Sequence, residues 1–323
     1  MKFEELKRKL KESVKNCYFV YGSDLFLKQK AVDLIVESSV ESAEELNVLT
    51  FSTDNLDVGK VIDACNTMPF FSNKKVVIIK EYEKKSSDAF IKKMEEYLKS
   101  PNESTCLILI SEEDSIYFEA LKKYSEVVDC NPLSGVLLEK IIDTEVAKKN
   151  KSIDYIAKKL LIEYCSGNLS RINAELSKLL FLDRANIITV EMVKENVTKD
   201  LEFEIYELTN ALSEKNTKDA YIMVKHLLDS KNTPSSIFAL IYRHFRRLFY
   251  IAISNNANLK ELSEQLGVKE FAIKKSGELV KNFGIAKLKE INELCLELDY
   301  KTKIGKYNAE DAIYYFVMTI LNI

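Results

Sequence analysis

Hydrophobic positions along the chain change their spacing after about residue 135. Before that point, short apolar runs rich in β-branched residues alternate with longer segments in which apolar residues recur at helical intervals. The runs occupy residues 17–21, 46–51, 76–79, 106–110 and 127–130, and helical segments follow the first four at 24–36, 57–67, 87–98 and 116–124. Strands separated by helices of this length predict a parallel sheet that is covered by helices on both faces.

Strand signals are absent after the last of these runs, and the remaining chain has the spacing of amphipathic helices. Thr233 and Pro234 supply an N-cap and a first-turn proline for a helix that is apolar around much of its surface. Such a helix is expected at the centre of a bundle. The predicted fold class is therefore α/β plus all-α, with domains at 1–135, 136–205 (short helices) and 206–323 (longer helices).

The most informative segment joins the second helical segment to the third apolar run. Pro69 disfavours helical backbone at Met68, so the helix should end by Thr67. Phe70 and Phe71 then fall in a short connection, where a surface position is the default. Two adjacent aromatic residues on a loop tip are a candidate anchor for a partner's pocket. The alternative is that one or both rings fold back onto their own core.

Composition describes a soluble globular protein, because 46% of the residues are hydrophobic and 30% are charged. No apolar run approaches the roughly 20 residues that span a bilayer. The N-terminal residues include Glu4 and Glu5 where a signal peptide would be apolar, so we expect a cytoplasmic protein without a membrane partner. The six cysteines are scattered singly, which favours small buried side chains over a disulfide framework.

The first strand–helix turn, residues 21–28, is where an open α/β domain would bind a nucleotide. A phosphate-binding loop needs several glycines and a Lys followed by Ser or Thr, whereas this turn has one glycine, Gly22, followed by Ser23 and Asp24. Asp24 would repel a phosphate from the helix N-terminus. Lys80 ends the third strand, where an ATPase of this type would carry acidic metal ligands. The pattern indicates a dismantled nucleotide site; the alternative is an atypical but active ATPase.

Other enzyme chemistry has little support. The only histidines, His226 and His244, lie in predicted helices without an evident Cys or carboxylate cluster. The acidic run at 112–114 follows a strand but has no partnering ligands at a useful spacing, so a solvated loop is expected. We therefore expect no catalytic site, no metal site and no cofactor in this chain.

Charge is uneven although the net charge is only −3. Residues 211–323 carry 17 Lys and Arg against 13 Asp and Glu, a net charge of +4, which leaves 30 against 37, or −7, for residues 1–210. Such an asymmetry permits a nucleic-acid contact. Residues 262–269, within the region 260–275, also fit a DNA-binding helix-turn-helix. Neighbouring acidic residues weaken its attraction for phosphate, which favours an ordinary turn in a bundle.

Several motifs together resemble one family. They are Tyr18-Phe19-Val20-Tyr21-Gly22-Ser23-Asp24-x-Phe26-Leu27, Thr67-Met68-Pro69-Phe70-Phe71-x-x-Lys74-Lys75-Val76-Val77, Gly167-Asn168-Leu169-x-x-Ile172-x-x-Glu175-Leu176-x-Lys178-Leu179, Ile241-Tyr242-Arg243-His244-Phe245-Arg246-Arg247-Leu248 and, more loosely, Asp299-x-Lys301-x-x-x-Gly305. In this order they resemble the delta subunit of the bacterial DNA polymerase III clamp loader. The first two motifs are fairly specific, and the helical ones are weak when taken alone.

The resemblance implies a degenerate AAA+ module in the first two domains, the second being a small helical lid, and a third helical domain that joins an oligomeric collar. It implies a clamp-loader subunit that binds and opens the sliding clamp (beta) at primer–template DNA without hydrolysing ATP, inside a DNA-directed DNA polymerase (nucleotidyltransferase) holoenzyme. Its other expected partners are clamp-loader subunits of the ATPase and delta-prime types. The implied clamp-binding residues are Phe70 and Phe71, supported by Thr67, Met68 and Pro69. Arg171 stands where true AAA+ ATPases place a phosphate-sensing arginine, and here we expect a remnant or a surface ion-pair partner.

Overall fold

The computed structural model describes residues 1–322 except 53–55, 81–86, 113–118, 134, 183–185, 255–257 and 269. The chain forms two compact units, Met1–Pro132 and Leu133–Ile323. Among the described residues, no helix is both long enough and apolar enough to cross a membrane.

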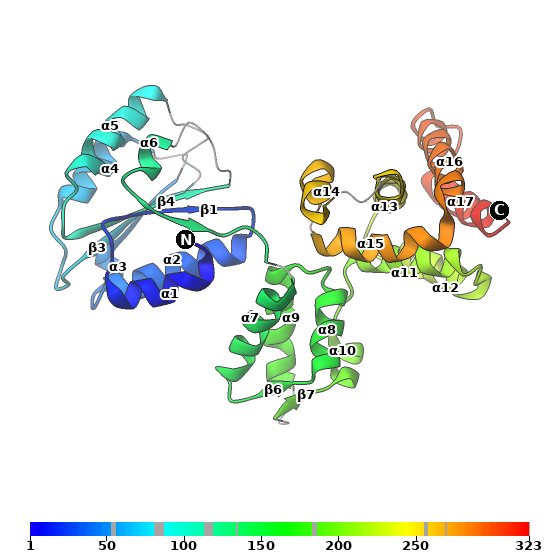
Figure 1. Ribbon diagram of the computed structural model, residues 1–323, viewed down its shortest axis with the longest axis horizontal. Coiled ribbons are helices and arrows are strands. Elements are labelled where there is room, and N and C mark those ends of the chain that lie inside the picture. Colours follow the sequence, from blue (N-terminus) through cyan, green and yellow to red (C-terminus); the bar gives the residue numbers. More distant parts are fainter. Residues whose placement is uncertain are drawn as a thin grey trace. The chain divides into compact units, whose positions relative to one another are not determined.

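The first unit is built on a five-stranded sheet whose strands are all parallel, as the apolar runs predict. Its spatial order is β2 (Val48–Phe51), β3 (Lys75–Lys80), β4 (Thr105–Ser111), β1 (Cys17–Tyr21) and β5 (Glu126–Asp129). The helices are α1 (Phe3–Glu12), α2 (Leu25–Ser39), α3 (Glu44–Asn47), α4 (Val58–Asn66), α5 (Asp88–Lys99) and α6 (Glu119–Lys122). Figure 1 shows α1 and α2 on one face of the sheet and α4 and α5 on the other.

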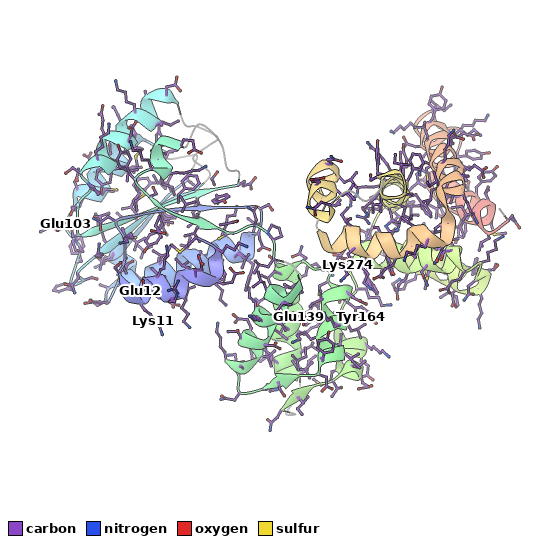
Figure 2. All side chains as sticks on the ribbon, in the orientation of Figure 1. Lys11, Glu12, Glu103, Glu139, Tyr164 and Lys274 are labelled. Carbon is purple, nitrogen blue, oxygen red and sulfur yellow. The ribbon has the colours of Figure 1, made fainter. Side chains whose placement is uncertain are left out.

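The three central strands, β3, β4 and β1, are buried on both faces along most of their length. Successive side chains of a strand point to opposite faces of the sheet. Phe19, Ile79 and Leu107 point to the face that α4, α5 and α6 cover, where they pack with Cys65 of α4 and Met94 of α5. The intervening strand residues are buried as well, on the face that α1 and α2 cover (Figures 1 and 2). Helices on both faces account for the continuous apolar runs in the sequence.

Three elements of this unit differ from the sequence-based expectation. The pattern does not predict α1, although Leu6 and Leu10 on its inner face are buried. The expected strand at 46–51 begins two residues later, at Val48, because α3 occupies the preceding residues. Of the helix expected at 116–124, residues 116–118 lie outside the described part of the chain, and α6 covers Glu119–Lys122.

The second unit is mostly helical. Its elements are α7 (Gly135–Ala147), β6 (Ser152–Ile153), α8 (Tyr155–Tyr164), α9 (Leu169–Leu182), β7 (Ile187–Ile188), α10 (Val190–Asn196), α11 (Leu201–Ser213), α12 (Thr217–Leu228), α13 (Pro234–Ile253), α14 (Leu259–Leu266), α15 (Glu270–Phe283), α16 (Ile285–Lys303) and α17 (Ala309–Asn322). The short parallel pair β6–β7 is absent from the sequence-based expectation. Two-residue strands leave no apolar run that periodicity could detect.

The helix expected at the bundle centre is α13. The Thr233 hydroxyl accepts a hydrogen bond from the amide of Ser236, and Pro234 occupies the first turn. The helix buries Phe238, Phe245 and other apolar residues against α15, α16 and α17, and Figure 1 shows it end-on among these helices. The central position of this helix is therefore confirmed.

Candidate functional site

The connection between α4 and β3 forms an exposed apolar tip, defined here as residues 67–71. Helix α4 ends at Asn66, and Thr67 follows in extended backbone with its hydroxyl donating to the carbonyl of Asp63 at 2.8 Å. The helix end that Pro69 predicts is thus confirmed. Strand β3 begins at Lys75, so the tip is a short surface connection.

The aromatic rings of the tip lie outside the core. Phe71 is 90% exposed and Phe70 is 52% exposed, and Met68 beside them is also exposed. The alternative in which one or both rings fold back onto their own core is therefore wrong. Adjacent exposed aromatic residues form an apolar surface of the kind that fills a pocket on another protein.

A buried asparagine from another element holds the main chain of the tip. Asn47, the last residue of α3, is 0% exposed. Its side-chain Oδ1 accepts a hydrogen bond from the amide of Phe70 at 2.7 Å, and its Nδ2 donates to the carbonyl of Phe70, also at 2.7 Å. The same Nδ2 lies 3.0 Å from the carbonyl of Ser42 and 3.1 Å from that of Ala43. One side chain therefore joins the turn before α3 to the tip.

Phe71 has an unusual backbone conformation. Its φ of 50° lies in the left-handed region, which large side chains rarely adopt because the Cβ atom crowds the main chain. The hydroxyl of Ser42 donates to the carbonyl of Phe71, and the hydroxyl of Ser72 accepts from the amide of Glu41 at 3.2 Å. Strained backbone at an exposed aromatic residue is typical of a functional position rather than of packing.

The turn at Gly22 is shaped by close packing of main chains. Gly22 has a φ of 135°, and a Cβ atom there would lie 2.3 Å from the carbonyl carbon of Cys130. Asp24 is buried at the N-cap of α2, where its Oδ1 accepts from the amide of Leu27 at 3.0 Å. Ser23 between them is exposed. A carboxylate of the chain itself thus occupies the helix N-terminus, where a phosphate would otherwise bind.

A cavity of about 180 Å³ lies beside this turn, at the carboxyl ends of β3 and β4. Lys28 and Lys80 line it together with Leu25, Gln29, Ile110, Ser111 and Glu112. Lys28 is buried and its Nζ lies 3.5 Å from the carbonyl of Ser111, whereas Lys80 is exposed. Burial raises the pKa of the nearby Cys130 thiol to about 12, with a further contribution from Asp129 and Asp24, so the thiol stays protonated at neutral pH.

Among the described residues that line this cavity, Glu112 is the only one with an acidic side chain that could bind a metal ion. Of the acidic run at 112–114, Glu112 lines the cavity and the other two residues lie outside the described ranges. Within those ranges, no group of three or more His, Cys, Asp or Glu residues could hold a metal ion.

Arg171 is engaged by its own unit. Its Nε lies 3.2 Å from Oδ2 of Asp200, and its terminal nitrogen donates to the carbonyl of Thr198 at 3.2 Å. Asp200 caps α11, and its amide donates to the carbonyl of Tyr164 at the end of α8 (Figure 2) at 2.7 Å. Arg171 therefore has the ion-pair role that the sequence allows, and it joins α9 to the start of α11.

The two histidines lie on helices, and within the described ranges neither belongs to a cluster of Cys, His or acidic residues that could hold a metal ion. His226 is exposed, 3.5 Å from a carboxylate oxygen of Glu204. His244 is buried, and a terminal nitrogen of Arg247 lies 2.8 Å from its Nδ1. Burial and, second, the Arg247 guanidinium hold the pKa of His244 well below its ordinary value, so its ring is neutral.

The helix-turn-helix motif considered for DNA binding corresponds to α14, a turn at Gly267 and α15. Lys269 and the side chains of Glu264 and Glu270 lie outside the described part of the chain. Helix α15 packs against α11 and α13, and its Lys275 forms an ion pair with Glu163 at 2.7 Å. This packing favours an ordinary turn in a bundle over a helix that is free to enter a DNA groove.

The aromatic tip is evident from the sequence, whereas the two residues that hold it, Asn47 and Ser42, are not. An asparagine before an apolar strand is a common pattern, so neither residue carries a sequence signal that distinguishes it from other loop residues. Their roles depend on a contact between segments that are 23 to 29 residues apart.

Comparisons with known proteins agree on one family. The sequence-family model of the DNA polymerase III delta subunit matches residues 18–131, and the family model of its C-terminal domain matches residues 202–320. DNA polymerase III subunit delta of Bacillus subtilis (strain 168) is 25% identical over 338 residues, which cover 99% of this chain and 97% of that protein. The subunit from Escherichia coli (strain K12) is 22% identical and covers 80% of this chain and 75% of its own length.

A solved structure shares the fold. The Bacillus subtilis DNA clamp loader delta protein superposes with a TM-score of 0.74 at 24% identity, and the match covers 99% of this chain and all of that one. The two family models describe the same subunit and together match most of the chain. On this evidence the chain belongs to the DNA polymerase III delta subunit family.

Proposed function

We propose that this chain is the clamp-loader subunit that binds the sliding clamp through its 67–71 tip and opens it for loading on primed DNA. The observation that carries the proposal is the exposure of Phe70 and Phe71 on this tip. The main chain of the tip is held by the side chain of Asn47, which belongs to another element. A pocket on the clamp would remove both rings from water. Rings anchored in this way commonly account for about 2–4 kcal/mol each in truncation experiments.

The subunit would act without hydrolysing ATP, as part of a polymerase holoenzyme in the cytoplasm. The Asp24 cap at the start of α2 and the close approach of Gly22 to Cys130 both support this, because they leave no glycine loop to surround a triphosphate. Other subunits would bind and hydrolyse ATP.

Three functional parts follow from the proposal: the α/β domain at 1–135, a lid at 136–205 and a collar domain at 206–323. An apolar groove of about 290 Å³ supports the collar role. It lies between α12 and α17 and is lined by Thr217, Lys218, Tyr221, Val224, Tyr314, Val317, Met318 and Leu321. Neighbouring loader subunits of the ATPase and delta-prime types would cover such a surface, and the net charge of +4 on residues 211–323 would favour primer–template DNA nearby.

The decisive experiment measures the affinity of the full chain for the sliding clamp of the same organism. Phe70→Ala with Phe71→Ala should lower the affinity at least 30-fold, about 2 kcal/mol, and should abolish release of the clamp from circular DNA. Phe181→Ala is the matched control, because Phe181 on α9 is also highly exposed but lies outside the tip. Normal clamp binding by the double variant would remove the tip from the interface.

The double variant also needs a stability measurement. Truncating exposed rings leaves no core cavity, so its free energy of unfolding should stay within about 0.5 kcal/mol of wild type. Phe245→Ala in the bundle core should instead lose about 3–5 kcal/mol. This contrast separates a loss of binding from a loss of folding.

A further inference from the structure

We propose that Asn47 is a positioning residue for the clamp contact, holding the 67–71 tip in its binding conformation before the partner arrives. The proposal rests on the clamp-binding function proposed above. Asn47 does not present its own side chain to a partner, since it is completely buried. It acts through the main chain of Phe70.

The two hydrogen bonds between Asn47 and Phe70 run in opposite directions and fix the peptide groups on both sides of the Phe70 Cα atom. One joins Oδ1 to the amide and the other joins Nδ2 to the carbonyl, each at 2.7 Å. No other described side chain bonds to both of these Phe70 groups. An asparagine can form this reciprocal pair because its amide carries a donor and an acceptor side by side.

A second set of contacts fixes the next residues. The Ser42 hydroxyl donates to the carbonyl of Phe71, and Nδ2 of Asn73 donates to Oε1 of Glu41 at 2.8 Å. Glu41, Ser42 and Asn47 therefore hold residues 70–73 by hydrogen bonds. This contact retains Phe71 at a φ that a large side chain in a free loop rarely adopts.

A held tip changes binding because ordering a loop at an interface has an entropic cost. Here the cost is met during folding, when Asn47 and Ser42 form their bonds, rather than during association. Without Asn47 the tip would sample other conformations, and only the competent fraction would bind, which reduces the apparent affinity by that fraction. We expect Asn47→Ala to weaken clamp binding about 10-fold while both rings remain present.

The first test needs no clamp. Chymotrypsin cleaves after aromatic residues in segments that open locally, so the rate of cleavage after Phe70 and Phe71 reports how firmly the tip is held. Asn47→Ala should speed this cleavage at least 10-fold, with the sites identified by mass spectrometry. Asn292→Ala is the control, because Nδ2 of Asn292 also donates to two main-chain carbonyls, those of Leu288 and Phe245, but in the other unit.

The second test is a double-mutant cycle on clamp affinity. If Asn47 acts through the tip, Phe71→Ala should cost clearly less affinity in an Asn47→Ala background than in wild type. A merely structural asparagine would leave the cost of Phe71→Ala unchanged. Equal costs in the two backgrounds would overturn the proposal.

Two further arms keep the test decisive. If Asn47→Ala does not fold, Asn47→Asp replaces it, because aspartate keeps the size of the side chain and its acceptor oxygen but lacks the Nδ2 donor to Phe70. Unchanged cleavage and affinity in the variant that folds would refute the positioning role. If instead Phe70→Ala with Phe71→Ala binds the clamp normally, the proposed function fails, and the cleavage assay still decides whether Asn47 holds the tip.

Discussion

The main chain of Gly22 lies so close to that of Cys130 that a Cβ atom on Gly22 would approach the Cys130 carbonyl carbon to 2.3 Å. In addition, the φ of 135° at Gly22 is accessible only to glycine at low cost. Close packing therefore explains why glycine occupies position 22, in the turn where open α/β domains commonly bind phosphate.

Gly22→Ala should lower the free energy of unfolding by about 3 kcal/mol, through overpacking and backbone strain. Gly277→Ala is the matched control, because Gly277 lies within α15 with ordinary φ and no atom within 4 Å of the added Cβ. That change should raise stability by about 0.5–1 kcal/mol. Chemical denaturation of both variants measures the difference, and similar stabilities would contradict the close approach at Gly22.

The backbone at Phe71 predicts an unusual order of stability for two truncations. Both Phe71→Gly and Phe71→Ala remove the exposed ring, but only glycine adopts a φ of 50° without steric cost. We expect the glycine variant to be more stable than the alanine variant by about 1 kcal/mol in thermal or urea unfolding. In ordinary loop backbone the order would be reversed, because glycine gains more entropy on unfolding.

The isolated chain should neither bind nor hydrolyse ATP. Asp24 occupies the N-terminus of α2, and Leu25 lines the neighbouring cavity where a glycine loop would be needed. Titration of labelled ATP with magnesium against the pure protein should give no saturation up to millimolar concentrations. Saturable micromolar binding that is lost in Lys80→Ala would locate a working nucleotide site at this cavity and contradict the prediction.

Substitutions in the groove between α12 and α17 should impair assembly with other loader subunits without affecting clamp binding. Tyr221→Ala with Met318→Ala removes two exposed apolar side chains that line the groove. It should reduce co-elution with the other loader subunits about 10-fold while leaving clamp affinity intact. The Phe70→Ala, Phe71→Ala variant should behave in the opposite way. A groove variant that assembles normally would exclude this surface from the collar contact.

His244 predicts a pH dependence of stability. Because its pKa in the folded protein is well below 6.5, the unfolded chain binds a proton that the folded chain does not. Stability is therefore full above pH 6.5 and falls as the pH drops below it, with a slope approaching about 1.4 kcal/mol per pH unit. Urea unfolding between pH 7 and pH 5 should show a smaller slope in His244→Gln, with His226→Gln as the control for a surface histidine. An unchanged slope in His244→Gln would contradict a neutral buried ring.

The sequence by itself determined the parallel sheet, the central helix α13 and the end of α4, because each depends on local stereochemistry. Buried strands need apolar runs, an amphipathic helix repeats every 3.6 residues, and Pro69 disfavours helical backbone at the residue before it. The same local rules placed Phe70 and Phe71 in a short connection, although they left open whether the rings would be exposed.

Only the tertiary structure decided the features that depend on contacts between distant segments. Asn47 contacts Phe70, 23 residues away, and Arg171 of α9 pairs with Asp200, the N-cap of α11. Neither contact has a local sequence pattern. The strands β6 and β7 are two residues long, and they form because packing brings Ile153 and Ile188 into register. Periodicity reports which face of an element is apolar, whereas the position of a single polar side chain depends on which segment folds against it.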